Sequence, residues 1–183
     1  AGDMSPIAYR SYGLDDYLAD AAVWNVVQTV HVECGLPPKD QLSETDWLQG
    51  LADTRGVIGG VVAGANLDDP GVEPLLEAQA ARANVRGVRQ IVNWHKDPAK
   101  TYGPTDLLLS DAWRAGYALL AKYGLSFDLQ LYPSQMATAA HNFWASLTAE
   151  QQQKCGFQLG DQERFNWHFI PRERKGLTWN EMT

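Results

Sequence analysis

Apolar and polar positions follow a repeating order along most of this chain. Short apolar runs rich in β-branched residues alternate with longer stretches in which apolar positions recur every three or four residues. The runs predict strands at 26–34, 57–67, 85–94 and 125–132, and the stretches predict helices at 14–22, 44–54, 70–83 and 110–124, with another helical stretch starting at Pro133. Strict alternation of this kind favours parallel strands joined by right-handed crossovers.

Two α/β architectures fit four such repeats. One is an open wound sheet, and the other is part of a (β/α)8 barrel, which normally needs about 250 residues. Gly59, Gly60 and Gly64 lie inside the second predicted strand. Glycine weakens the interior of a strand but suits close packing inside a barrel. The predicted fold class is therefore α/β, with parallel strand–helix repeats that form part of a TIM-type barrel and a short α-rich C-terminal appendage.

Charge divides the chain near residue 140. Residues 1–140 hold 10 basic and 17 acidic side chains, whereas residues 141–183 hold 5 of each. We therefore predict a partial barrel over 1–136 and an appendage of different origin over 137–183. In the appendage, 141–154 has the pattern of an amphipathic helix, and Arg172, Arg174 and Lys175 are expected in a solvated loop.

Composition limits the classes of function. Apolar residues make up 45% of the chain and charged residues 20%, as in ordinary globular proteins, and no apolar run is long enough for a membrane span. No signal-like segment is recognisable, so we expect a cytoplasmic protein. The net charge of −7 disfavours nucleic-acid binding. Cys34 and Cys155 match no disulfide or zinc-finger spacing and are expected to be reduced.

Polar side chains collect where the predicted strands end. The carboxyl ends of parallel strands meet at one rim, where (β/α) barrels keep their sites. Alternation along each strand predicts which side chains point the same way: His31 with Glu33, Arg89 with Asn93, and Asp128 with Gln130. The candidate catalytic residues are His31, Glu33 and Asp128, and the candidate substrate-binding residues are Asn66, Arg89, Asn93 and Gln130.

Each of these residues also has a structural interpretation. His31 has no second histidine two or four residues away, so it fits a hydrogen-bonded structural histidine better than a metal ligand. Two interpretations of Arg89 are open: an ion pair with Asp128 or Glu33, and binding of a substrate carboxylate. Asp128 is expected as the partner of Arg89 more than as a general base. His95 is expected in a loop. No dinucleotide-binding, P-loop, nucleophile-elbow or HExxH motif occurs.

Five segments, in unbroken order over about residues 9–136, resemble the lactonase-like, amidohydrolase-related branch of the metal-dependent hydrolases. They read YLADAAVWNVVQTVHVEC, ETDWLQGLAD, VVAGANLDDPGVEPLLEAQA, NVRGVRQIVNWH and LSFDLQLYPSQM. The resemblance implies a (β/α)8 barrel, hydrolysis of small carboxylate-bearing lactones, and a divalent metal such as zinc or manganese. It also implies that Arg89 binds the substrate carboxylate and that His31, Glu33 and Gln130 face the same mouth.

The metal ligands that the resemblance implies are incomplete. The His-x-His pair of the family's first strand is absent, and His31, His95, His141 and His168 do not replace it. A metal lowers the pKa of its bound water far below that of bulk water, to about 7, which is worth about 12 kcal/mol of nucleophile activation. We therefore expect a hydrolase-like protein with impaired activity.

Two other functions stay open. The first is a non-catalytic half-barrel, a binding or assembly module that completes its sheet as a homo-oligomer. The second is another chemistry at the rim, supported by a metal that His31 and Glu33 hold. The tail, with NWHFIPRERKGL its most specific part, resembles the start of a separate bacterial domain family of unknown function. Together the two resemblances suggest a hybrid chain.

Overall fold

The computed structural model describes residues 11–146, 148, 149 and 152. The chain divides into two compact units, residues 1–139 and 140–183, and each is considered by itself. The helices are α2 (Leu14–Asp20), α3 (Gln41–Arg55), α4 (Val72–Ala80), α5 (Asp111–Tyr123) and α6 (Met136–Ser146). The strands are β1 (Thr29–Val32), β2 (Ile58–Gly64), β3 (Val85–Ile91) and β4 (Ser126–Gln130), and three short 3-10 turns cover Pro38–Asp40, Leu107–Leu109 and Pro133–Gln135.

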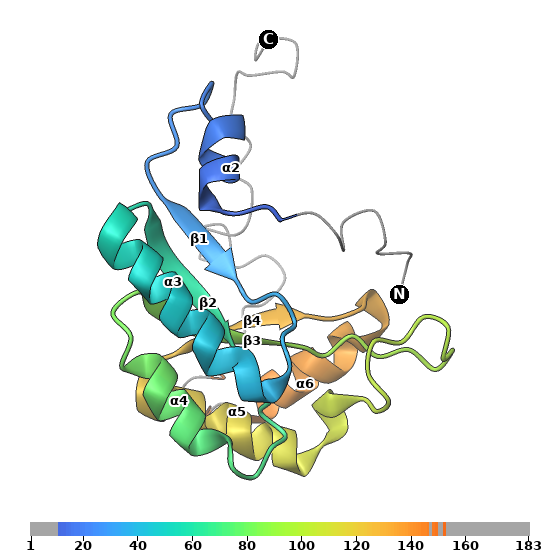
Figure 1. Cartoon of the computed structure of the whole chain (residues 1–183). Helices are drawn as coiled ribbons and strands as arrows, with labels where there is room; N and C mark the ends of the chain where they lie inside the picture. The colour runs from blue at the N-terminus through green and yellow to red at the C-terminus, as the bar shows by residue number, and fades with distance from the viewer. Residues whose placement is uncertain (1–10, 147, 150–151, 153–183) are drawn as a thin grey trace, which may run out of the picture. The chain divides into compact units, whose positions relative to one another are not determined.

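The four strands form one parallel sheet in the order β1-β2-β3-β4. Each strand thus pairs with its neighbour in sequence, as in a (β/α) barrel and unlike a doubly wound sheet, whose order reverses at a switch point. The predicted α/β class and parallel pairing are confirmed. Helices α3, α4 and α5 wrap around one side of the sheet (Figure 1).

The elements begin and end where local chemistry favours it. The Ser110 hydroxyl accepts a hydrogen bond from the Trp113 amide at 3.2 Å and caps α5, and Gly124 ends that helix with a φ of +65°. Serine is a favoured N-cap residue, and glycine is the residue that most readily adopts a positive φ at the end of a helix. The predicted first strand, 26–34, is shorter in the structure, because only Thr29–Val32 lie beside β2.

The hydrophobic core lies between the sheet and α3, α4 and α5. Side chains of β2 and β3 meet those of the helices there, and the fully buried members include Val61, Leu67, Leu76, Val88 and Leu108. Trp113 of α5 packs edge-on against Phe127 of β4, with ring centroids 5.6 Å apart. This core fixes the strands, and the strands fix the loops at their carboxyl ends.

A buried glutamine ties two of those loops together. Gln135 Oε1 accepts hydrogen bonds from the amides of Trp94 at 3.0 Å and Tyr132 at 3.1 Å. Its Nε2 donates to the Val92 carbonyl at 2.9 Å and to the Asp106 carboxylate at 2.8 Å. One satisfied side chain therefore joins the segments that follow β3 and β4.

No described helix combines the length and the apolar character that a membrane span needs.

The C-terminal predictions fall partly outside the described residues. The helix predicted over 141–154 is described as α6 up to Ser146. The predicted loop with Arg172, Arg174 and Lys175 lies outside the described residues, as does His168.

Candidate functional site

A pocket of about 480 Å³ opens at the carboxyl ends of β1, β2 and β3. We call it the rim pocket. Its polar lining comes from Glu33, Gln41, Asn66, Asp68, Arg89 and Gln90, and the loops 35–38 and 102–105 complete its wall. Three predicted site residues, Glu33, Asn66 and Arg89, thus lie together, as the convergence of parallel strands requires.

The centre of the rim pocket is an ion pair between β3 and the end of β1. Arg89 Nε donates to Glu33 Oε1 at 2.8 Å, and Arg89 Nη2 donates to the Glu33 carbonyl oxygen at 2.6 Å. The Gly35 amide donates to the other carboxylate oxygen of Glu33 at 2.5 Å. The Glu33 side chain is 7% exposed and that of Arg89 is 22% exposed. Of the two carboxylates expected to pair with Arg89, the structure selects Glu33.

Amide side chains hold the rest of the lining. Gln41 Nε2 donates to Asn66 Oδ1 at 2.9 Å, and Gln90 Nε2 donates to the Asp68 carboxylate at 2.7 Å. Gln90 Oε1 accepts from the Leu67 amide at 2.9 Å. Gln41 Oε1 is buried and has no partner among the described residues. This unpartnered oxygen lies beneath the lining, and the accessible acceptors of the pocket are its carboxylates.

The candidate catalytic residue Asp128 and the candidate substrate-binding residues Asn93 and Gln130 lie outside the rim pocket. Asp128 and Gln130 of β4 are exposed, and they lie opposite Arg89 and Ile91 in the β3–β4 register. Neither lines the pocket. Asn93 follows β3, and its buried Oδ1 has no partner in the part of the chain that the structure describes.

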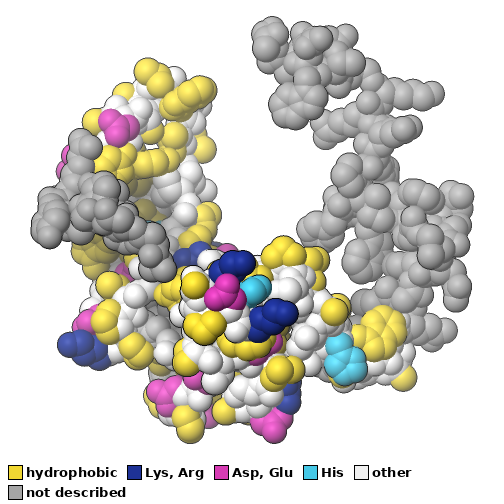
Figure 2. All heavy atoms as spheres, turned by 90° about the vertical axis from the view of Figure 1, so that its right-hand side faces the viewer, with side chains coloured by type: hydrophobic (Ala, Val, Ile, Leu, Met, Phe, Trp, Pro, Cys, Tyr) yellow, Lys and Arg dark blue, Asp and Glu magenta, His cyan; other side chains and the backbone are white. Residues whose placement is uncertain are grey.

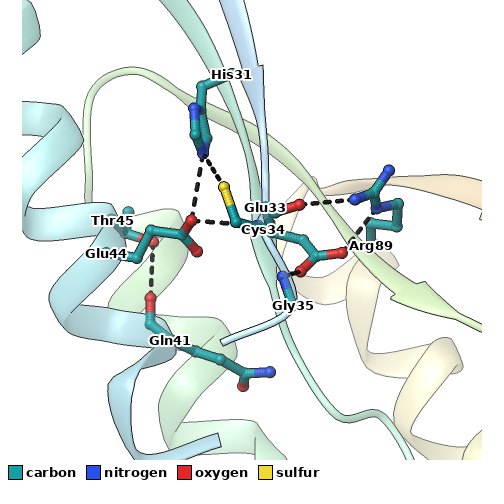
Figure 3. A network of polar contacts seen from close by, with 8 residues as sticks. All are labelled: His31, Glu33, Cys34, Gly35, Gln41, Glu44, Thr45 and Arg89. Carbon is teal, nitrogen blue, oxygen red and sulfur yellow. Dashed lines mark hydrogen bonds and ion pairs between the residues drawn. The ribbon is translucent and has the colours of Figure 1, made fainter. Parts of the chain in front are cut away.

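His31 belongs to a different cluster from Glu33. Its Nε2 lies 3.3 Å from Glu44 Oε1 of α3 and 3.7 Å from Cys34 Sγ, whereas Glu33 binds Arg89 (Figure 3). Strand alternation predicted that His31 and Glu33 point the same way. The strand ends at Val32, so alternation does not extend to Glu33.

The imidazole, thiol and carboxylate of this second cluster point toward one another (Figure 3). We call His31, Cys34 and Glu44 the β1–α3 cluster. Their potential ligand atoms all lie within 4.8 Å of one another. Glu44 Oε1 also accepts from the Cys34 amide at 3.2 Å. Sequence reasoning missed Cys34 and Glu44, because Glu44 lies on the next helix and no motif links it to His31.

The environment of Cys34 favours its protonated form. Partial burial of the sulfur, and then its hydrogen bond to the Glu44 carboxylate, raise the pKa of the Cys34 thiol above its ordinary value. The Glu44 and Glu33 charges raise this pKa further, while the Arg89 charge lowers it. A metal cation that binds the sulfur displaces this proton.

Three comparisons place the chain among known proteins. Over 136 residues it is 43% identical to "Uncharacterized protein y4mH" of Sinorhizobium fredii (strain NBRC 101917 / NGR234). The aligned region covers 74% of this chain and 46% of that protein. The crystal structure of an amidohydrolase from Burkholderia multivorans with bound zinc matches with a TM-score of 0.60 at 19% identity, covering 79% of this chain and 46% of that one. Residues 132–183 match the family "Protein of unknown function (DUF3500)".

These likenesses confirm the predicted architecture. The sheet and its helices share the fold of part of that crystal structure, as expected for a partial TIM-type barrel. The chain spans about half the length of the proteins it matches. The match of the tail confirms the predicted domain family of unknown function. The described residues also contain one group, the β1–α3 cluster, with ligand types suited to a metal ion.

Proposed function

We propose that this chain is a hydrolase-like barrel module that binds a small hydroxyl-bearing lactone in the rim pocket. The observation that carries the proposal is the anchored Arg89. Its Nε and Nη2 are held by Glu33, while Nη1 has no hydrogen-bond partner among the described residues. An arginine fixed in this way presents its remaining N–H groups in a defined direction, suited to the carbonyl oxygen of a cyclic ester.

Charge favours a neutral lactone over a free carboxylate. The ionic groups that line the pocket are Glu33, Asp68 and Arg89, and their formal sum is negative. A ligand carboxylate would face two like charges and would compete with Glu33 for Arg89. The Asp68 carboxylate is instead an acceptor for a ligand hydroxyl group.

A comparison of two related ligands, a lactone and its ring-opened acid, tests the proposed substrate class. Isothermal titration calorimetry on the 183-residue chain would compare a hydroxylated lactone with its ring-opened hydroxy acid. We expect the lactone to bind more tightly. Arg89→Lys keeps the charge that Glu33 needs but loses the guanidinium fork. It should weaken lactone binding by about 2- to 10-fold, the effect of one hydrogen bond to a neutral group.

Arg86→Lys is the matched control for that experiment. Arg86 lies on the same strand, is exposed, and donates to the nearby Ala83 and Val85 carbonyls instead of lining the pocket. Its replacement should leave lactone binding unchanged. Tighter binding of the hydroxy acid, or equal binding by Arg89→Lys and the original chain, would contradict the proposal.

Hydrolysis by the chain alone should be weak. The sequence contains no His-x-His pair, and Arg89 polarises a carbonyl without activating water. A pH-stat assay should therefore show little acid release from a lactone that calorimetry shows to be bound.

A second candidate function is assembly with another copy of the chain. β1 and β4 each pair with a single strand among those described. Val23, Trp24, Val27 and Val30, on and before β1, are 84%, 73%, 74% and 67% exposed. Figure 2 shows hydrophobic side chains over much of the upper lobe, which holds α2 and the segment leading to β1. This apolar edge favours a homo-oligomer that extends the sheet.

Sedimentation velocity tests this second candidate. A homo-oligomer that Val30→Lys converts to monomer would support it, whereas a stable monomer at high concentration would exclude it. The lactone titration is independent of this result.

A further inference from the structure

The β1–α3 cluster combines three kinds of metal ligand from two elements. His31 supplies an imidazole nitrogen from β1, Cys34 a sulfur from the segment after it, and Glu44 a carboxylate from α3. The His31 and Glu44 side chains are 24% and 7% exposed, and residue Cys34 is exposed. Two of the ligands are thus fixed in the fold, and the third lies at the surface.

The spacing of these atoms suits tetrahedral zinc. Zinc bonds of about 2.0–2.1 Å to nitrogen or oxygen and about 2.3 Å to sulfur place ligand atoms about 3.3–3.6 Å apart at tetrahedral angles. His31 Nε2 lies 3.3 Å from Glu44 Oε1 and 3.7 Å from Cys34 Sγ. The His31 nitrogen is therefore already near its tetrahedral distance from both other ligands.

We propose that His31, Cys34 and Glu44 form a Zn²⁺ site with a fourth position open to water. A combination of imidazole, thiolate and carboxylate suits zinc and is unlike the all-oxygen sets that bind magnesium or calcium. Three protein ligands leave one coordination position free, as in catalytic zinc sites. The exposed Cys34 gives the ion a route from solvent.

Binding exchanges one proton for the metal. The Cys34 thiol loses its proton to the solvent as the sulfur–zinc bond forms. The neutral His31 imidazole carries its proton on Nδ1 when Nε2 binds zinc, so the contact between His31 and Glu44 is replaced by two bonds to zinc without further proton release. The charged groups nearby are Glu44, Glu33 and Arg89. Because Glu33 and Arg89 pair with each other, the Glu44 carboxylate is the charge that attracts the cation.

The zinc site goes beyond the proposed lactone binding and does not depend on it. None of its three residues lines the rim pocket, whereas Glu33 and Gly35, which flank Cys34, do. A lactone titration and a zinc titration can therefore succeed or fail separately.

The first experiment is zinc binding by the full 183-residue chain. Protein freed of metal with a chelator is titrated with Zn²⁺ against a competing chromophoric chelator, and bound zinc is counted by elemental analysis. We expect one zinc per chain. Changes in outer-shell partners already cost about 10- to 100-fold in metal affinity, so loss of a direct ligand in Cys34→Ser should weaken binding by at least about 100-fold.

Two matched variants distinguish this site from adventitious binding. Cys155→Ser removes the other cysteine of the sequence, and His141→Asn removes an exposed histidine outside the cluster. Both should bind zinc as the original chain does. Glu44→Gln keeps an acceptor for the Cys34 amide but removes the anionic ligand. It should lower zinc affinity while circular dichroism shows an unchanged fold.

Cobalt provides a direct readout of the thiolate. Co²⁺ substituted for zinc should show a sulfur-to-cobalt charge-transfer absorption, absent from Cys34→Ser and present in Cys155→Ser. Zinc binding should also release a proton and strengthen as pH rises. The proposal is overturned if the chain binds no zinc, if Cys34→Ser binds it equally well, or if the charge-transfer band depends on Cys155.

Discussion

The middle of the sheet and its edges differ in how much they are buried. In β2, six of seven residues are buried, including Val61 at 1% exposure. No residue of β1 or β4 is buried, and Val30 of β1 is 67% exposed. Valine is therefore a core residue at Val61 in β2 and a surface residue at Val30 in the neighbouring strand β1.

The buried strands in the middle of the sheet stabilise the fold, and the candidate binding groups lie at the ends of the strands. The core around β2 and β3 supplies the apolar burial that holds the fold together. The pocket and the β1–α3 cluster lie at the ends of strands, where polar groups are partly exposed. Changes in the middle should therefore unfold the protein, and changes at the edge should alter binding.

The largest expected effect comes from a glycine behind the middle of the sheet. A Cβ on Gly116 of α5 would lie 2.0 Å from the Leu67 carbonyl oxygen, whereas one on Gly50 of α3 would meet nothing within 4 Å. Gly116→Ala should destabilise the protein by about 3 kcal/mol. Gly50→Ala should stabilise it by about 0.5–1 kcal/mol, because alanine favours the helix. Urea unfolding of both variants tests this contrast, and equal effects would contradict it.

The second-largest expected loss of stability is at the Arg89–Glu33 ion pair, which joins β3 in the middle of the sheet to the end of the edge strand β1. Arg89→Met leaves the Glu33 carboxylate buried without its partner. Such a loss costs about 3–5 kcal/mol in a fully buried pair, and the partial exposure of Arg89 reduces this to about 2–3 kcal/mol. Arg55→Met removes an exposed pair with Asp15 and should have a much smaller effect, because solvent screens that pair. Thermal unfolding of the two variants measures the difference.

A matched valine pair sharpens the comparison directly. Val61→Ala removes two buried methyl groups and should cost about 2 kcal/mol. Val30→Ala, on the neighbouring edge strand, should cost less than about 0.5 kcal/mol. Similar losses of unfolding free energy for the two would show that the edge of β1 is covered in solution.

The smallest effect lies on the helical surface. Hydrogen bonds from Lys122 and Tyr123 hold the pKa of Glu73 below its ordinary value of 4.5. A lowered pKa stabilises the fold above the ordinary value, and this contribution is lost as pH falls through the folded pKa. The Tm advantage of the original chain over Glu73→Gln should therefore shrink on acidification, and an advantage constant with pH would contradict it.

The sequence predicted the repeating fold well, because burial patterns and caps are local. The Ser110 and Gly124 caps of α5 follow from residue type alone. The start of β1 did not follow. Val26 and Val27 have strand propensity, but a strand also needs a neighbour, and pairing with β2 begins at Thr29.

The candidate site was predicted only in part. Glu33, Asn66 and Arg89 meet because parallel strands end together, which topology alone implies. The partners of His31 depend on where β1 ends and on how α3 packs beside it. Neither is a local property of the sequence, so alternation grouped His31 with the wrong acid and left Glu44 unnoticed.

The order of the strands bears on how this protein is made. Each strand of the sheet pairs with the one synthesised just before it, so no later strand has to insert between two earlier ones. A nascent chain emerging from the ribosome can therefore add one strand and its covering helix at a time, each closing a short loop onto a template already in place. The growing edge is the point at which such a chain needs protection until the next strand arrives.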